Sequence, residues 1–479
     1  MLANLRRARK ITEVKFNTFI INCCLVLSGC VSYDFDENLE RINQNDDVVP
    51  SGEVVAAITR DQQDALNNRA ALILQEEVGE FEAVELMLLK SPSFQRLLFE
   101  NLAEGSLAAQ TGNISNPTLS LERMVKGTET EYGRFLTFGL IDVFTLPMRK
   151  KYANRAVQSA TLNLEANIFG AITGLRLAWL EAVAAEERFS LAEDTYTALS
   201  ASAELAKRMK QAGNMATSER IDQQLLFSAA TVALAEAKQQ RLSSREKLIR
   251  LLGLGTSEGK NLQLPSALPD IPEQPIQPED IEKDLQQRFD VRAARLDYEM
   301  SLENLGIENI TSYTDIELGY RHDRIDDDGT ISKKRGYEIE IKIPVFDWGD
   351  LERDAAQADA LSRQNEYKQV VLNAGSEVRV AYGAYRTAFD IAEHYQDQVL
   401  PMQETLLEEA NYNYNGMIIG VFELLQTGTA KASAEINAIT AKQNTLAAAI
   451  NLYSVLAGNQ SDMEFDTISA SETKQDKGH

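Results

Sequence analysis

The chain has 479 residues, of which 44% are hydrophobic and 25% charged, and its formal net charge is −24. This acidity argues against a protein that binds nucleic acid or anionic lipid through its overall charge. With three cysteines and three widely spaced histidines (His322, His394 and His479), the sequence predicts neither a disulfide framework nor a metal site.

The N-terminus has the pattern of a targeting segment. Basic residues lie between Arg6 and Lys15, a short apolar stretch covers Phe16–Leu27, and Leu27-Ser-Gly-Cys30 follows. We therefore predict a signal peptide over residues 1–29. The residues Leu27–Cys30 resemble the lipobox of bacterial lipoproteins, which implies acylation of Cys30. The alternative is an ordinary secretory signal with a chance cysteine.

Two predicted parts of the chain follow the signal peptide. Residues 30–77 are polar and are expected to be an extended, lipidated segment, and residues 78–252 are predicted to form the first structural repeat. Its expected elements are a helix over 78–110 broken at Pro92, strands at 118–124 and 134–141 around a polar loop at 126–132, a long helix from about 148 to Gly213, and a helix over 217–252.

The same plan returns after a proline-rich linker over residues 253–280. The second repeat, 281–458, is expected to hold a helix over 281–310, strands at 315–322 and 336–343 around an acidic loop at 323–335, a helix over 350–415 interrupted near Pro401, a stop at Gly416, and a last helix from Val421. Residues 459–479 are polar, and we expect a disordered tail.

Two landmarks support a duplication. Val143-Phe-Thr-Leu-Pro147 lies 202 residues before Val345-Phe-Asp-Trp-Gly349, and Gly213 lies 203 residues before Gly416. The helix between the landmarks therefore has nearly the same length in both copies. At ~1.5 Å per residue such a helix reaches about 100 Å, so the helices form rods. We expect no membrane-spanning helix in the body of the chain.

The four strands alternate apolar and polar residues with a period of two. Leu119 and Leu121 share a side, as do Ile316 and Leu318, with acidic residues on the other side. A membrane barrel requires this alternation, but a soluble sheet packed on helices has it too. Because a membrane barrel needs at least about eight strands, four strands of membrane length must be completed by further copies of the chain.

The order of these elements resembles the outer-membrane efflux (TolC-like) family. The resemblance rests on Asn116–Glu122, Arg288–Ala294, Ile343–Gly349 and Tyr414–Leu425. It implies a mainly α fold with long antiparallel helical hairpins in an α-barrel, and a homotrimer whose strands complete a 12-stranded β-barrel in the outer membrane. It also implies a periplasmic adaptor and an inner-membrane pump as partners.

Three groups of candidate functional residues follow from this interpretation. The strand carboxylates are predicted to line the pore: Glu122, Glu317, Glu338 and Glu340. The helix tips are predicted to contact the adaptor: Gly213, Asn214, Met215, Ala216, Gly416, Met417, Ile418, Ile419 and Gly420. The resemblance places a gate near Tyr414 and Glu423. The alternatives are a merely wetted strand face and plain helix-capping chemistry.

No motif points to catalysis or to a cofactor. Gly253-Leu-Gly255 lies at a helix end and not in a phosphate-binding loop. We therefore expect that the protein is not an enzyme, and the resemblance implies a passive outer-membrane duct of a Gram-negative bacterium, for heavy-metal cations or drugs. The alternative is a lipid-anchored periplasmic coiled-coil scaffold or adaptor without a pore.

Overall fold

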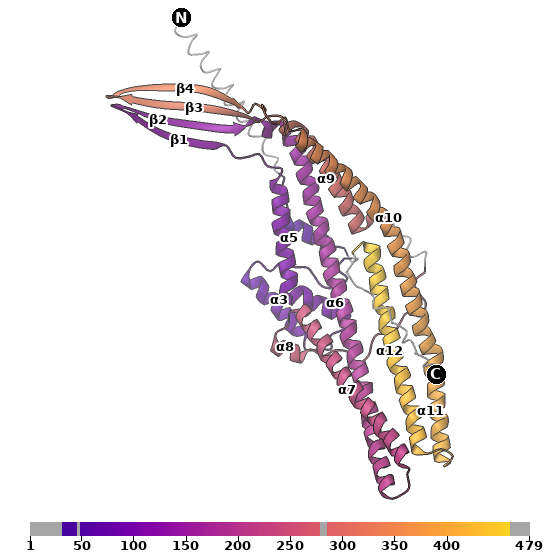
Figure 1. Cartoon of the computed structure of the whole chain (residues 1–479). Helices are drawn as coiled ribbons and strands as arrows, with labels where there is room; N and C mark the ends of the chain where they lie inside the picture. Colours follow the sequence, from indigo (N-terminus) through magenta and orange to yellow (C-terminus); the bar gives the residue numbers. More distant parts are fainter. Residues whose placement is uncertain (1–30, 46–47, 278–284, 460–479) are drawn as a thin grey trace, which may run out of the picture. The chain divides into compact units, whose positions relative to one another are not determined.

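The computed structural model describes residues 31–45, 48–277 and 285–459, so the predicted signal peptide, Cys30 and the C-terminal tail lie outside the described residues. The principal helices are α2 (Phe35–Asn43), α3 (Arg60–Ile73), α4 (Glu80–Lys90), α5 (Pro92–Gln110), α6 (Leu140–Gln211), α7 (Thr217–Leu252), α8 (Thr256–Asn261), α9 (Phe289–Thr311), α10 (Asp350–His394), α11 (Leu400–Asn415) and α12 (Val421–Ala457). The strands are β1 (Thr118–Lys126), β2 (Glu129–Gly139), β3 (Ile316–Asp327) and β4 (Thr330–Ile341) (Figure 1).

The chain divides into two compact units. One contains Leu98–Leu164 and Arg292–Val370 with the N-terminal residues up to Glu40, and the other contains Arg41–Leu97, Glu165–Val291 and Val371–His479. The first unit holds the sheet and the second holds the helix tips. The expected mainly α fold with four strands is confirmed.

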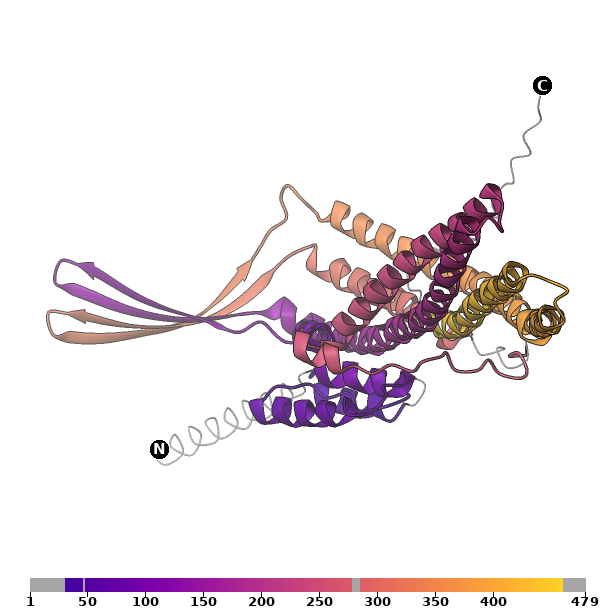
Figure 2. The same ribbon diagram turned by 90° about the horizontal axis from the view of Figure 1, so that it is seen from below.

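The four strands form one antiparallel sheet in the order β1-β2-β3-β4. Each repeat supplies a hairpin, and pairing of β2 with β3 from Glu129↔Asp327 to Gly139↔Glu317 joins the two hairpins. The strands twist strongly along their length, as Figure 2 shows. The sheet is thus built from both halves of the chain.

The hairpins are longer than the sequence analysis predicted. The expected loops at 126–132 and 323–335 are mostly strand, and only Gly127-Thr128 and Asp328-Gly329 make turns. Asp328 and Gly329 both have positive φ, of 49° and 85°, which is the backbone of a two-residue hairpin turn whose twist matches the strands. These segments are rich in charged residues, which is typical of loops, so the sequence did not indicate that they pair as strands.

Helix α6 begins eight residues before the predicted start and contains Pro147 within it. The expected strand residues Leu140 and Ile141 therefore belong to the helix. The matching segment, Val345–Gly349, is not helical and precedes α10. The two landmark sequences thus occupy equivalent positions in the repeats, but the first is helical and the second is not.

The predicted interruption near Pro401 is confirmed. A π-helical turn, η3 (Tyr395–Val399), separates α10 from α11, and the Leu400 N–H donates to the Tyr395 carbonyl five residues back. Proline lacks an N–H and its ring crowds the preceding turn, so the wider turn accommodates it without ending the helix.

The segment over residues 30–77 is not extended as predicted. It forms α2 and α3, and the apolar side chains of Phe35, Ile42 and Val54 are buried. In the linker, α8 is followed by a stretch whose Leu262 and Leu268 are also buried. In the N-terminal segment and in the linker, a few apolar residues among many polar ones therefore pack into the core.

One helix contains a segment apolar enough to cross a membrane. Among the described residues, an 18-residue window of α6 has a mean hydropathy of 1.4 and so meets the length and composition of a membrane span. However, 61% of that window is buried, as in the core helix of a soluble protein.

Candidate functional site

The register of the sheet sorts its side chains onto two faces. One face carries the large apolar residues, and we call it the apolar face: Leu119, Leu121, Leu136, Phe138, Ile316, Leu318, Tyr320, Tyr337, Ile339 and Ile341. The other carries the four predicted pore carboxylates, and we call it the acidic face. The predicted alternation is therefore realised across all four strands.

The acidic face brings the predicted carboxylates together. Glu317 lies directly opposite Glu340, and Glu338 lies opposite Gly319. Like charges opposite each other repel, so this arrangement requires water or a cation beside it. A face of this kind suits a wet channel wall.

Glu122 differs from the other three because it belongs to an ionic cluster. The Arg321 guanidinium lies 3.3 Å from the Glu122 carboxylate and 3.0 Å from Asp323, which is buried. Gly133 faces both acids across the sheet and has no side chain to obstruct them. The sequence pattern did not reveal this cluster, because Asp323 fell in an expected loop. Gly133, a glycine within a strand, was the one sign in the sequence that neighbouring side chains needed room there.

The apolar face is uncovered. Its residues Leu121, Tyr337 and Ile339 expose 74%, 79% and 62% of their surface. A soluble sheet packed on helices would bury this face, so that alternative does not describe the structure. A contiguous apolar surface of this size marks a membrane or protein contact.

Exposed aromatic residues lie in both segments that follow the sheet hairpins. Phe144, near the start of α6, and Phe346, before α10, are 70% and 100% exposed, and Trp348 is 59% exposed. These residues lie in the two landmark segments of the repeat. Aromatic side chains at the end of an apolar strand band are typical of a membrane–water interface.

The two helix tips have the same construction. Residues 212–216 join α6 to α7, and residues 416–420 join α11 to α12. In the first tip the Asn214 N–H donates to the Met209 carbonyl at 2.9 Å, and in the second the Ile418 N–H donates to the Asn413 carbonyl at 2.8 Å. Each helix therefore ends in the same capping motif.

The residue in the left-handed conformation is Gly213 in one tip and Met417 in the other, with φ of 83° and 57°. The predicted stop at Gly416 is confirmed, because α11 ends at Asn415 and Gly416 is its C-cap, but Gly416 has a φ of −77° and the left-handed residue is the next one. Met417 is 92% exposed and Ile418 is 74% exposed, whereas Ile419 is half-buried. The tip thus exposes two of the three predicted apolar residues.

Among the other predicted tip residues, Asn214, Ala216 and Gly420 are exposed and Met215 is half-buried. Ala216 and Gly420 both precede a helix. Glu219 accepts a hydrogen bond from the Ala216 N–H at 3.1 Å, which caps α7.

The gate candidates lie on the two sides of the second tip. Tyr414 is 41% exposed near the end of α11, and Glu423 is exposed in the first turn of α12. Glu423 occupies the place in α12 that Glu219 has in α7. Within the described part of the chain its carboxylate makes no hydrogen bond, so it is available to ions.

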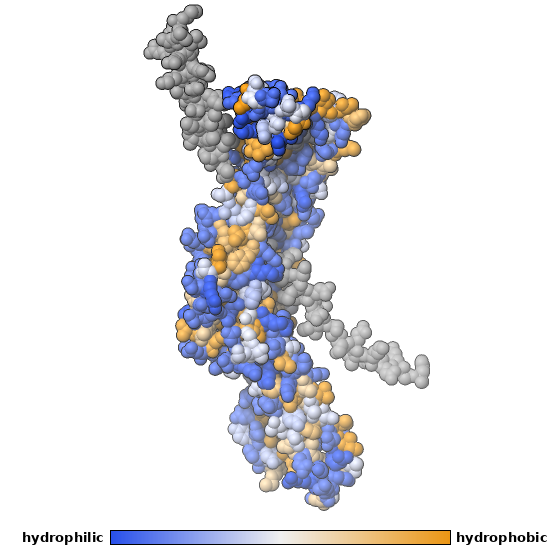
Figure 3. Space-filling model, turned by 90° about the vertical axis from the view of Figure 1, so that its left-hand side faces the viewer, coloured by the Kyte–Doolittle hydropathy of each residue, from blue (hydrophilic) through white to orange (hydrophobic). Residues whose placement is uncertain are grey.

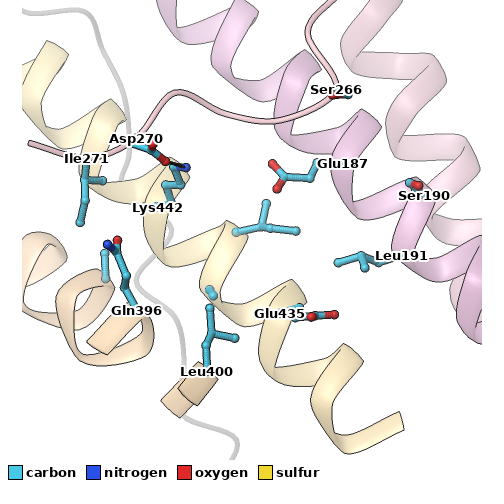
Figure 4. Close-up of a pocket in the computed structure, with 13 residues that line it drawn as sticks. Glu187, Ser190, Leu191, Ser266, Asp270, Ile271, Gln396, Leu400, Glu435 and Lys442 are labelled. Atoms are coloured by element: carbon cyan, nitrogen blue, oxygen red, sulfur yellow. Dashed lines mark hydrogen bonds and ion pairs between the residues drawn. The ribbon is translucent and has the colours of Figure 1, made fainter. Parts of the chain in front are cut away.

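A cavity of about 490 Å³ opens beside α6, α12 and the linker (Figure 4). Glu187 and Glu435 line it, and Lys442 is 2.7 Å from Asp270 at its edge. Over the described residues, no group of three or more histidine, cysteine or acidic side chains is placed to hold a metal ion.

Comparison with known proteins identifies the second repeat of the chain. Residues 281–458 match the sequence model of the outer membrane efflux protein family. This part of the chain is an outer membrane efflux protein domain. The domain contains β3, β4, α10, α12 and the second tip, so one hairpin of the sheet belongs to it.

Solved channels share the fold of most of the chain. The similar structures include CusC (16% identity, TM-score 0.65, covering 80% of this chain and 93% of CusC) and CmeC from Campylobacter jejuni (14%, 0.65, 86% and 90%). VceC from Vibrio cholerae has 15% identity and a TM-score of 0.65, covering 85% of this chain and 99% of VceC. The efflux domain is thus part of a TolC-like fold. No curated protein matches the sequence significantly.

Within the efflux domain, the motif Arg288–Ala294 has a structural role. Arg288 is 1% exposed, and its guanidinium binds Asp290 at 2.8 Å and Glu377 on α10 at 2.7 Å. The motif therefore holds the start of α9 against α10.

Proposed function

We propose that the protein is the outer-membrane duct of an efflux system and acts as a homotrimer. The observation that carries the proposal is the uncovered apolar face of the sheet, opposite a face rich in carboxylates. An apolar exterior and a polar interior are what a membrane barrel needs, because lipid cannot hydrogen-bond to polar groups.

The sheet requires copies of itself to close. Strands β1 and β4 each pair on one side only, and the strands have 9 to 12 residues, enough to cross a membrane. Open edges are incompatible with the lipid interior, and three chains would supply twelve strands. This count and the fold support a trimer.

The carboxylates of the acidic face would surround the pore in three copies. Glu317 and Glu340, opposed across β3 and β4, would favour cations and repel anions. This field is consistent with heavy-metal cations or cationic drugs as the transported class.

The helix tips would bind the adaptor. Met417 and Ile418 expose apolar side chains at the end of a helical hairpin, which is a surface that a partner helix could cover. We place a periplasmic adaptor there, driven by an inner-membrane pump. A lipid on Cys30 would add a second attachment to the outer membrane.

Reconstitution tests the proposal. Protein extracted in detergent should run as a heat-sensitive trimer and conduct ions across a planar lipid bilayer, with cations preferred. A Cys30→Ala variant should keep both properties, because the sheet itself enters the membrane. If that variant is a water-soluble monomer without conductance, the protein is the lipid-anchored scaffold instead.

A further inference from the structure

The apolar face ends in two rungs of basic residues toward the hairpin turns. The first rung holds Leu121, Arg134, His322 and Arg335, and the second holds Arg123, Tyr132, Arg324 and Lys333. We call these eight residues the basic rungs. Neighbouring strands lie about 4.8 Å apart and alternate residues about 7 Å apart, so the five Arg and Lys side chains occupy one small patch.

These cations are not neutralised by carboxylates within the described residues. Arg324 lies directly opposite Lys333, and like charges in this position repel. In the part of the chain that the structure describes, none of the five Arg and Lys residues forms an ion pair, and all five are exposed. Asp326, one rung further on, is the nearest carboxylate on this face. Arg123 lies over the Tyr132 ring at 5.8 Å.

The strand register places the basic residues of these rungs on one face of the sheet and the neighbouring carboxylates on the other. Lys333 belongs to the apolar face, whereas its neighbour Lys334 points to the acidic face, where it lies opposite Asp323. The net charge of −24 argued against anionic lipid as a partner. On this face of the sheet, however, the local charge is positive, and the carboxylates of these rungs lie on the other side.

The height of the basic rungs matches a membrane interface. From Ile316 to Arg324 the strand rises by about 26 Å, and a tilt of about 40° reduces this to about 20 Å across the membrane. The apolar band of an outer-membrane barrel is about 25 Å tall, so the rungs lie close to its upper boundary. Figure 3 shows hydrophilic residues gathered at the turn end of the sheet, toward the viewer at the top.

We propose that the basic rungs bind the phosphate groups of a phosphorylated lipid in the leaflet nearest the hairpin turns. Arg324, Lys333 and Arg335 would donate charge-assisted hydrogen bonds to the phosphates, while acyl chains cover Tyr337 and Ile339 below them. The proposal rests on the proposed function, because it requires the apolar face to contact the membrane.

Lipid binding to the full-length protein in detergent tests the proposal. Native mass spectrometry measures the affinity for bisphosphorylated lipid A, with dephosphorylated lipid A and inorganic phosphate as comparison ligands. The wild-type protein should prefer the bisphosphorylated lipid to both. The Arg324→Gln/Lys333→Gln variant should bind it about tenfold more weakly, since two cations close to an anionic lipid are lost.

Lys334→Gln is the matched control, because it removes one cation from the adjacent position on the other face. It should keep wild-type lipid affinity, and Lys333→Arg should keep it too. Equal affinity in wild type and the double variant would overturn the proposal, as would equal binding of phosphate and lipid or an equal loss in Lys334→Gln.

Conductance in a bilayer of neutral lipid distinguishes this proposal from the channel function. A wild-type protein that conducts but does not prefer the phosphorylated lipid refutes the lipid site alone. If the protein does not conduct at all, the proposed function is wrong. A heat-sensitive trimer in each variant shows that the sheet has formed.

Discussion

Gly213 and Met417 occupy the same place in the two helix tips. Each is the second residue of a five-residue turn, and each has positive φ, 83° for Gly213 and 57° for Met417. A left-handed conformation suits glycine but costs an L-residue with a side chain about 1–2 kcal/mol. The second tip therefore carries a strained residue whose side chain is almost wholly exposed, which is where a partner contact is expected.

Replacing Met417 with glycine should stabilise the second tip. The variant relieves the left-handed strain, and after the entropy cost of glycine we expect a gain of about 1 kcal/mol. Hydrogen exchange of the Ile418 amide, which is bonded to Asn413, should slow about fivefold. Gly213→Met is the reciprocal control and should speed exchange at Asn214. Unchanged exchange in both variants would show that the turn carries no strain.

Neutralising the two β4 carboxylates of the acidic face should weaken cation selectivity. Glu338→Gln/Glu340→Gln removes two negative charges per chain from the acidic face. In a salt gradient across a planar bilayer, the reversal potential should move toward zero. Tyr337→Phe, on the apolar face next to Glu338, should leave the reversal potential unchanged. An unaltered potential in the double variant would exclude the acidic face as the pore wall.

Glu423→Gln should raise single-channel conductance, because it removes a carboxylate proposed to narrow the tip. Glu219 is the matched control, since it is the third residue of α7 as Glu423 is of α12. Glu219 caps its helix through the Ala216 N–H, and glutamine could still accept that hydrogen bond, so Glu219→Ala tests loss of helix capping. Equal conductance changes in the two variants would point to helix fraying and not to a gate.

Arg288→Met should destabilise the helical unit by about 3 kcal/mol, because Glu377 and Asp290 lose their buried partner. The midpoint of thermal unfolding, followed by helical circular dichroism, should fall. Arg288→Lys keeps the charge but cannot bind Asp290 with two parallel hydrogen bonds, so its loss should be intermediate. An unchanged midpoint in Arg288→Met would show that the network is dispensable.

The ion pair between Lys90 and Glu258 should make the stability of the folded protein depend on pH in the acidic range. The hydrogen bond from Lys90, 2.8 Å long, and one from the Gly255 N–H lower the pKa of Glu258. A lowered folded-state pKa stabilises the protein above the unfolded value of about 4.3, and this contribution is lost as pH falls through the folded value. The difference in unfolding midpoint between wild type and Glu258→Gln should therefore be constant near neutral pH and vanish in acid. A difference that persists in acid would contradict this assignment.

The sequence determined the elements with strong local signals. Alanine-rich stretches without internal breaks predicted α7 and α12 closely, because helix propensity and apolar periodicity act within a few turns. Pro401 marked the π-helical turn through its missing N–H. The alternation of Leu119–Glu122 and Tyr337–Ile341 fixed which side chains share a face.

Only the tertiary structure decided which residues meet. The charged segments around Asp323 and Lys333 looked like loops, and they became strands because β2 and β4 pair with β3 over its whole length. Pairing between distant segments satisfies backbone hydrogen bonds whatever the side chains are, so local composition does not reveal it. The same pairing placed the Arg321 cluster on one face and the basic rungs on the other. At the second tip, the capping hydrogen bonds selected Met417 over Gly416 for the left-handed position, because they depend on where α11 ends.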